Sequence, residues 1–386
     1  MKITLKNTPE QVELIKAMAS RNRDVAYEAQ TALAEFIGPV LAEVVNNAPT
    51  LSNLFTTLQY NADDNPSIPL DLYFDVSDED YVQVYSQSRA GGLPTSEVLP
   101  TSAELKIATY SLDSAVSFDR RYAAKSRMDV VAKTMTRVAQ EILLKQNSIS
   151  ANVIMKALAN ASTNSLKHII SSAANSRFVL GDLNALITRS KRISTSFSGG
   201  TPDARQGRGV TDIICGPEIV EELRAIAYNP INTKGAPMGT QAGNDDTVVQ
   251  TADVIAQQAY SAAGAPEFYG INVIELNEFG GFGTAQGQSY DSVFSTHAGS
   301  TQFPKADGSG TDTYAAATDA LIVGIDRSRE SLIRPVAVDA ENGGEFNLIA
   351  DDQYSIRQNK IGYFGSLEEG RVVLDDRALV GVIVNV

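Results

Sequence analysis

One stretch of the chain, from Asp119 to about Ala161, has the pattern of a single uninterrupted helix. It contains neither Pro nor Gly, and Asp119 is a suitable N-cap residue. Apolar residues recur three and four positions apart, which predicts one buried stripe made of Met128, Val131, Met135, Val138 and Ile142. At 1.5 Å per residue the helix would be about 60 Å long, roughly the width of a whole domain. A strut of this length suits an extended subunit that packs against copies of itself.

The composition excludes several classes of protein. The chain has 386 residues, 43% of them hydrophobic, which is enough for one large or two modest cores. No apolar run is long enough to span a bilayer, and the N-terminus lacks the apolar core of a signal peptide. A single cysteine, Cys215, excludes an intrachain disulfide and suits a reducing compartment. We therefore expect synthesis in the cytoplasm and no membrane partner.

The charge balance argues against a protein that reads nucleic acid. The net charge is −14, and Lys and Arg are dispersed along the chain. A nucleic-acid reader normally carries a basic patch, whereas an acidic surface repels phosphate and keeps a concentrated protein soluble. We expect no sequence-specific DNA binding, although an acidic wall around DNA stays compatible with this composition.

The segments that precede the long helix differ from each other in pattern. Residues 8–47 are predicted to be helical, with Thr8 as N-cap, and a break at Gly38-Pro39 predicts two helices or one kinked helix. Residues 51–118 alternate between apolar and polar side chains, which predicts strands and a long hairpin. A long hairpin is hard to bury on its own subunit, so we expect an arm that lies on a neighbour. The alternative is a β-domain that leads into the helix.

Helices and strands alternate in the second half of the chain, which predicts a mixed α/β domain. Two stretches rich in Gly and polar residues, 229–246 and 280–318, are predicted to be long loops. The expected regular elements are a helix at 182–193, a strand and helix at 211–226, a strand at 268–277, two strands within 318–340 that break near Arg327, and two or three closing strands after residue 345.

No catalytic or metal-binding pattern is present. The two histidines, His168 and His297, are far apart, and neither has a second His or Cys at metal-ligand spacing. Cys215 ends an apolar strand and is best interpreted as a buried, inert thiol. Phosphate-loop and nucleophile-elbow motifs are absent. Four pairs of adjacent acids lack the ligand spacing of a calcium loop: Asp63-Asp64, Asp245-Asp246, Asp351-Asp352 and Asp375-Asp376. We predict no enzyme, no cofactor and no metal site.

The order of these parts resembles the major capsid proteins of tailed bacteriophages, which have the Hong Kong 97-type fold. The resemblance spans nearly the whole chain and rests on architecture, because no short motif is diagnostic. It implies an α+β fold with an N-arm, an extended β-hairpin loop, a peripheral domain with a long spine helix and an α/β axial domain. The implied bounds are 1–50 for the N-arm, 51–118 for the extended loop and its flanking strands, 119–175 for the peripheral domain, 176–335 for the axial domain, 336–369 for the peripheral return strands and 370–386 for a C-terminal axial strand.

The family resemblance implies a structural function in the virion. Copies would assemble as pentamers and hexamers into an icosahedral shell around double-stranded DNA, with a portal, a scaffolding protein and in some cases a cement protein. The apolar side chains of the extended loop would lie over an adjacent subunit, each contributing about 1.5–3 kcal/mol when fully buried. These side chains are Leu70, Leu72, Tyr73, Phe74, Tyr81, Val82, Val84 and Tyr85.

The sequence departs from the founding member of that family, in which a loop lysine forms an isopeptide bond with an asparagine of a neighbour. No lysine lies between Lys16 and Lys106, so the extended loop cannot supply that nucleophile. We expect no covalent cross-link by that route. The N-terminal arm is also too short to include a cleaved scaffolding segment, so we expect a separate scaffolding protein.

Three other functions remain as alternatives. An encapsulin, a bacterial nanocompartment shell, would have the same fold, but encapsulins are smaller and lack such long loops. An α/β hydrolytic enzyme with a β-appendage is disfavoured by the few His and Cys residues, although a glycosidase that uses only carboxylates escapes this argument. A tube or sheath subunit would not need the single long helix.

Overall fold

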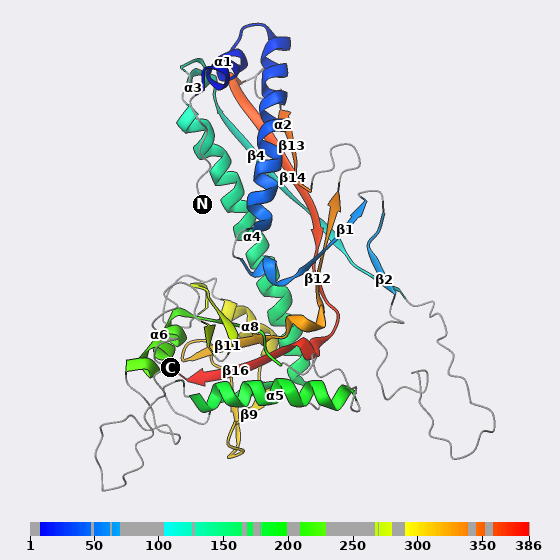
Figure 1. Ribbon diagram of the computed structural model, residues 1–386, viewed down its shortest axis with the longest axis vertical. Coiled ribbons are helices and arrows are strands. Elements are labelled where there is room, and N and C mark those ends of the chain that lie inside the picture. The colour runs from blue at the N-terminus through cyan, green and yellow to red at the C-terminus, as the bar shows by residue number, and fades with distance from the viewer. Residues whose placement is uncertain are drawn as a thin grey trace, which may run out of the picture. The chain divides into compact units, whose positions relative to one another are not determined.

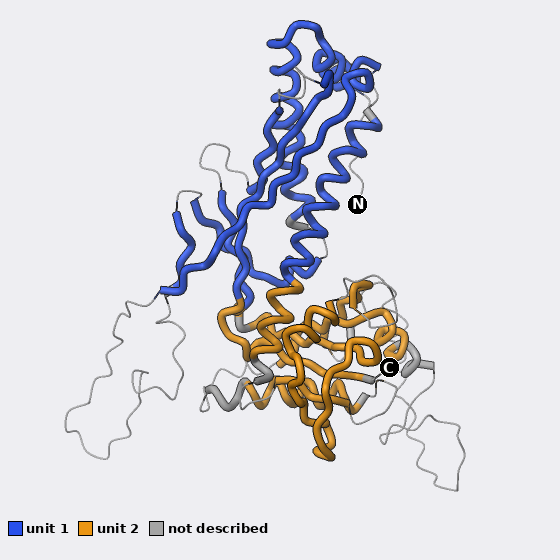
Figure 2. Tube along the Cα trace, turned by 180° about the vertical axis from the view of Figure 1, so that it is seen from behind, with its two compact units in different colours: residues 1–68, 104–150, 332–372 blue, residues 69–103, 151–331, 373–386 orange. Residues whose placement is uncertain are grey.

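The computed structural model has a mixed α+β fold, as the sequence predicts. Its chain divides into two compact units (Figure 2). Unit 1 comprises residues 1–68, 104–150 and 332–372, and unit 2 comprises residues 69–103, 151–331 and 373–386. The structure describes residues 8–47, 50–61, 64–69, 104–125, 128–163, 168–172, 178, 180–198, 209–228, 267–268, 270–279, 290–338, 345–351 and 358–385.

Unit 1 begins with two helices, but their boundary is not where the sequence pattern places it. Helix α1 spans Pro9–Met18, and the Thr8 hydroxyl accepts a hydrogen bond from the Gln11 backbone N–H at 3.4 Å, so the predicted N-cap is confirmed. Helix α2 spans Arg23–Asn47 and runs through Pro39, so a division into two helices at Gly38-Pro39 is wrong, whereas a kink at that point stays a prediction. Pro39 lies on the exposed side of α2, where solvent can reach the backbone carbonyl that a proline leaves without its N–H donor.

The predicted strut is confirmed as a long helix, but it begins later than expected. Asp119 caps a short helix, α3 (Arg120–Ala124), by accepting a hydrogen bond from the Arg121 backbone N–H at 2.9 Å. The long helix α4 spans Met128–Thr163 and has 36 residues, which is about 54 Å of helix. It contributes its residues up to 150 to unit 1 and the remainder to unit 2.

The helices of unit 1 pack on a long twisted sheet (Figure 1). Strand β14 (Lys360–Gly370) pairs antiparallel with β4 (Thr109–Asp119) along its whole length. On its other edge β14 pairs with β13 (Asn347–Asp351) and with β12 (Leu332–Val338). Strand β1 (Thr56–Asn61), which follows the 3₁₀ helix η1 (Leu51–Leu54), is parallel to β12, and the short β15 (Val372–Val373) also pairs with β12.

The segment predicted to form the extended hairpin is bracketed by a pair of short strands. Strand β2 (Ser67–Pro69) pairs with β3 (Glu104–Lys106), and the Ile107 N–H donates to the Pro66 carbonyl at 3.0 Å. The chain therefore leaves and re-enters unit 1 at neighbouring positions. Residues 70–103 lie outside the described part of the structure, so the predicted hairpin stays a prediction.

The core of unit 1 contains four of the five residues in the predicted stripe. Val131, Met135, Val138 and Ile142 are buried in one cluster with residues of α1, α2 and the sheet. The side chain of Met128 is outside the description. The sheet is closely covered at Gly365, where a Cβ atom would lie 2.5 Å from the Phe346 ring.

Unit 2 is built on a mixed six-stranded sheet in the order β5-β16-β11-β6-β8-β7. All seven residues of the central strand β11 are buried. Helices α5 and α6 contribute side chains to the same apolar cluster. The bounds are β5 Ile169–Ser171, α5 Leu180–Ser198, β6 Asp212–Cys215, α6 Pro217–Tyr228, β7 Glu267–Phe268, β8 Ile271–Glu275, β11 Asp319–Ile325, η4 Arg327–Arg329, η5 Asp376–Ala378 and β16 Leu379–Asn385. The break near Arg327, predicted between two strands, is confirmed as η4 between β11 and β12.

The predicted loop at 280–318 is wrong over its described part, residues 290–318. This part contains helix α8 (Tyr290–Ala298) and the hairpin of β9 (Gln302–Pro304) with β10 (Thr311–Thr313). The cause is a small aromatic core: the Phe294 ring centroid lies 5.0 Å from that of Tyr314 and 6.1 Å from that of Phe303. Contacts among these aromatic side chains stabilise a stretch that is otherwise polar.

Candidate functional site

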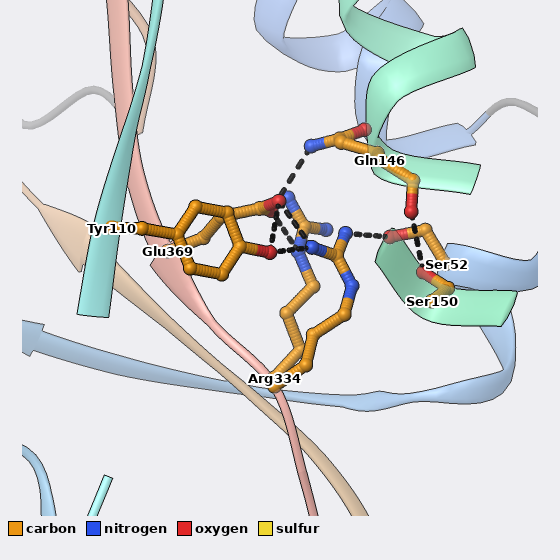
Figure 3. Close-up of polar contacts among 7 residues, drawn as sticks. Ser52, Tyr110, Gln146, Ser150, Arg334 and Glu369 are labelled. Atoms are coloured by element: carbon orange, nitrogen blue, oxygen red, sulfur yellow. Dashed lines mark hydrogen bonds and ion pairs between the residues drawn. The ribbon is translucent and has the colours of Figure 1, made fainter. Parts of the chain in front are cut away.

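The most distinctive polar feature of unit 1 is a buried charge network centred on Glu369 of β14 (Figure 3). Its carboxylate is fully buried and meets two arginines, Arg334 of β12 and Arg371, which are 3% and 8% exposed. Tyr110 of β4, Gln146 of α4 and Ser52 of η1 complete the network. We call these six residues the Glu369 network.

Each of the two oxygens of the Glu369 carboxylate accepts two hydrogen bonds. Oε2 accepts from Arg334 Nε at 2.8 Å and from Gln146 Nε2 at 3.0 Å. Oε1 accepts from the Tyr110 hydroxyl at 3.0 Å and from Arg371 Nη1. The second nitrogen of the Arg371 guanidinium, Nη2, donates to Ser52 Oγ at 2.8 Å. Glu369 is therefore saturated as an acceptor, and it has neither the exposure nor the free lone pair that a general base requires.

The electrostatics of the Glu369 network fit a structural role. The two guanidinium groups and the one carboxylate give the buried network a net positive charge. A buried charge is tolerated only when it is paired and hydrogen-bonded. Burial raises the pKa of Tyr110 above its ordinary value, so its phenol stays a neutral donor to Glu369. The Arg371 guanidinium also lies 6.0 Å from the centre of the Phe55 ring, close enough for a cation–π contact.

The Glu369 network joins the two chain segments that lead to and from residues 70–103. Ser52 lies in η1, ahead of β1 and β2, and Tyr110 lies in β4, directly after β3. Asn147 adds a parallel link, because its side-chain oxygen accepts from the Leu51 N–H at 3.1 Å. The base of the predicted extended loop is thereby attached to helix α4 and to the sheet.

The predicted site residues fall into two groups. The eight loop residues, from Leu70 to Tyr85, all lie outside the described part of the structure. Of the five residues in the predicted stripe of the long helix, four lie in the unit 1 core. The part of α4 that belongs to unit 2 buries Ala151, Ile154, Met155, Leu158 and Ala159.

The residues examined for chemistry occupy ordinary structural positions. His168 is buried, and its Nδ1 lies 2.9 Å from the Leu379 carbonyl oxygen, an arrangement in which Nδ1–H donates. His297 lies in the last turn of α8, so its predicted place in a polar loop is wrong. Cys215 is fully buried as predicted, and burial raises the pKa of its thiol to about 12.

Among the four pairs of adjacent acids, the structure describes Asp64, Asp351, Asp375 and Asp376, and none of them belongs to a metal cluster of described residues. The Asp375 side chain accepts from the Arg377 N–H at 3.0 Å and caps η5. No group of three or more potential metal ligands occurs among the residues that the structure describes. Within the same residues, no helix combines the length and the hydropathy needed to cross a membrane.

Sequence reasoning missed the Glu369 network, although a signal for it exists. Arg334 interrupts the apolar stretch of β12, and Glu369 and Arg371 stand close together at the end of β14. Charged side chains inside otherwise apolar strands indicate a buried ion pair when opposite charges occur in two such strands. Gln146 is harder to find, because it follows four turns of regular apolar spacing within the helix.

Comparisons with known proteins give structural similarity without sequence similarity. No model of a known protein family matches the chain, and no curated protein matches it. Among solved structures, one from Microbacterium phage Oxtober96 is 11% identical, with a TM-score of 0.47 over 88% of this chain and 91% of the other. The capsid of Cyanophage P-SCSP1u is 14% identical, with a TM-score of 0.44 over 87% and 88%. A holo encapsulin complex from Synechococcus elongatus is 12% identical, with a TM-score of 0.42 over 86% and 85%.

Proposed function

We propose that this chain is the major capsid protein of a tailed bacteriophage, which assembles as pentamers and hexamers into an icosahedral shell around double-stranded DNA. The observation that carries the proposal is the order of the parts along the chain. Two N-terminal helices come first, then strands β2 and β3 on either side of residues 70–103, then the 36-residue helix α4, an α/β unit and the closing strands. This is the order that the resemblance drawn from the sequence implies.

The chemistry of the described residues favours a structural role over an enzymatic one. The buried carboxylate of Glu369 has all its acceptor positions occupied by donors of its own chain. Cys215 is buried and its pKa is raised, which suppresses thiolate chemistry at neutral pH. A shell subunit needs stable surfaces rather than a reactive group, and these two sites fit that requirement.

In this proposal unit 1 corresponds to the N-arm and peripheral domain, and unit 2 to the axial domain. Residues 70–103 are the extended loop, and its eight apolar side chains lie on an adjacent subunit. The Glu369 network holds the base of that loop, so that contacts made by the loop transmit force to α4 and to the sheet instead of bending the strands β2 and β3. The partners are further copies of the chain, a portal and a separate scaffolding protein, with a cement protein as in some members of the family. The protein is made in the host cytoplasm and resides in the virion.

Assembly of the purified full-length chain tests this proposal. We expect rings or closed shells by negative-stain electron microscopy and fast-sedimenting species by ultracentrifugation, either alone or after coexpression with the neighbouring gene products. A chain that stays monomeric in all these conditions contradicts the proposal. Shells that package double-stranded DNA support a virus, whereas shells that hold only a protein cargo identify the encapsulin alternative.

A pair of loop variants tests the contact residues. Val82→Ser with Val84→Ser removes apolar surface from the predicted contact, so assembly is expected to fall strongly. The matched control, Gln83→Ser with Gln87→Ser, changes polar residues of the same segment and is expected to assemble like the unmodified chain. Equal assembly of both variants would exclude this segment from the contact between subunits.

The absence of lysine from residues 17–105 gives a separate expectation about the particle. After boiling in detergent and reductant, mature particles should release a single band at the mass of the monomer. A ladder of multimers would show a covalent cross-link of another kind.

A further inference from the structure

Two helices of unit 1 expose apolar side chains on faces of opposite charge. On α2 the exposed residues include Phe36, 56% exposed, and Val40, 41% exposed. On α4 the corresponding residue is Leu144, which at 58% is the most exposed large hydrophobic side chain of the described residues. Both helices also contribute to the unit 1 core, so these side chains lie on surfaces that face away from it.

After its first residue, Arg23, helix α2 carries only acidic charges. From Asp24 to Asn47 the helix contains four acidic residues and no Lys or Arg. Glu35 and Glu43 flank Phe36 and Val40 along the sequence, and at 3.6 residues per turn these four positions fall on one side of the helix. We call this set the acidic α2 face.

The exposed face of α4 in unit 1 has the opposite charge, in a chain whose net charge is −14. Lys133, Arg137 and Lys145 are exposed, and with Leu144 they fall within about 120° of the helix circumference. One acid, Glu141, lies among them. We call Lys133, Arg137, Leu144 and Lys145 the basic α4 face. Within the described part of the chain, none of the charged residues on these two faces takes part in a salt bridge.

The two faces match in spacing as well as in charge. Glu35 and Glu43 are eight residues apart, as are Arg137 and Lys145, which is about 12 Å along either helix. The exposed apolar residues lie between the charges in both cases. A pair of such helices can bury an apolar centre inside a rim of opposite charges, the arrangement typical of specific protein interfaces.

We propose that the acidic α2 face of one copy docks on the basic α4 face of a neighbouring copy. The contact deepens the capsid function proposed above and rests on it for the identity of the partner. It is heterologous, since it joins two different surfaces, and a heterologous contact builds a ring when the rotation between neighbours divides a full turn. Each copy would give its α2 face to one neighbour and receive the next neighbour on its α4 face.

Charge reversal on each face tests the contact. Variant A carries Glu35→Lys and Glu43→Lys, and variant B carries Arg137→Glu and Lys145→Glu. In either variant alone, the two reversed charges of one face meet two like charges of the other face, so its assembled fraction in sedimentation velocity is expected to fall at least tenfold. The matched controls alter net charge equally at exposed positions of the N-terminal region: Glu10→Lys with Glu13→Lys for variant A, and Lys16→Glu with Arg21→Glu for variant B. The controls are expected to assemble normally, and circular dichroism checks that every variant is folded.

Mixing the two variants provides the decisive measurement. In an equimolar mixture every contact between A and B again joins opposite charges, so assembly is expected to return, with even-numbered rings favoured over pentamers. The four-substitution variant, which swaps the charges of both faces, should also assemble. Normal assembly of A or B alone, or no recovery in the mixture and in the four-substitution variant, would overturn the contact while leaving the capsid proposal intact. A native chain that never assembles contradicts both.

Discussion

The two units stabilise their sheets with different core chemistry. In unit 2 the central strand β11 is buried along its full length, and its neighbours form a continuous apolar cluster. In unit 1 strand β14 alternates between buried and partly buried residues from Tyr363 to Glu369, and its C-terminal end holds the Glu369 network. A sheet covered on both faces needs apolar side chains throughout, whereas a sheet covered on one face needs them only at alternate positions.

One buried acid from each unit, Asp319 and Glu369, shows how differently a buried carboxylate can be satisfied. In unit 2 the Asp319 carboxylate accepts from the Ala315 N–H at 2.8 Å and from the Thr318 hydroxyl at 3.1 Å, so local groups satisfy it. In unit 1 the Glu369 carboxylate depends on arginines and on side chains that are distant in sequence. The first arrangement forms with its own turn, but the second forms only when the whole unit is folded.

The largest expected effect comes from breaking the network that distinguishes unit 1. Glu369→Ala leaves two buried guanidinium groups without their carboxylate and should cost about 3–5 kcal/mol of unfolding free energy. Urea unfolding followed by circular dichroism measures this. The neighbouring Glu368, which accepts hydrogen bonds from Tyr60 and Thr109, is the control, and its replacement by Ala should cost about 1 kcal/mol. Equal losses would mean that the Glu369 network is not what stabilises the unit 1 core.

The corresponding substitution in unit 2 is apolar. Ile322→Ala removes a buried side chain from β11 and should cost about 2–5 kcal/mol through lost transfer energy and a residual cavity. Ile349 in unit 1 is 47% exposed, so Ile349→Ala should change stability by only about 0.5 kcal/mol. A small loss for Ile322→Ala in urea unfolding would show that unit 2 does not depend on its apolar strand.

A smaller effect tests the packing on the unit 1 sheet. Gly365→Ala places a Cβ atom 2.5 Å from the Phe346 ring and should cost about 1–3 kcal/mol through overpacking. Because Phe346→Leu removes that ring, the double variant should be less destabilised than the sum of the two single variants. Simple additivity in the same unfolding measurement would show that the ring and Gly365 are not in contact.

The smallest effect on stability at neutral pH concerns Cys215 of unit 2. With its pKa raised to about 12, the folded thiol should react with an aromatic disulfide reagent at pH 8 far more slowly than the thiol of the urea-unfolded chain. The raised pKa also contributes stability that is present below about pH 9 and is lost as the pH rises toward 12, because the unfolded thiol loses its proton first. Cys215→Ala should remove this part of the alkaline slope. Rapid labelling of the folded chain would contradict the burial.

Parts of the fold could be predicted because their signals are local. The N-cap at Thr8, the long helix around Val131 and Met135, and the break near Arg327 all follow from capping chemistry or from apolar periodicity. The errors arose where a distant contact overrides a local preference. Pro39 does not end α2, since the helix packs on the sheet on its other side, and α8 forms because Phe294 meets Phe303 and Tyr314.

By itself, the sequence determined the α+β class, the long helix and the apolar strands of unit 2, because each depends on neighbours within a few residues. Only the tertiary structure decided which charges are buried together. Arg334 is 35 residues from Glu369 in the sequence, and Gln146 is 223 residues from it. No local pattern indicates that both side chains bind the Glu369 carboxylate. The tertiary structure also decided which residues form the acidic α2 face and the basic α4 face. These residues are exposed because the core of unit 1 covers the other side of each helix.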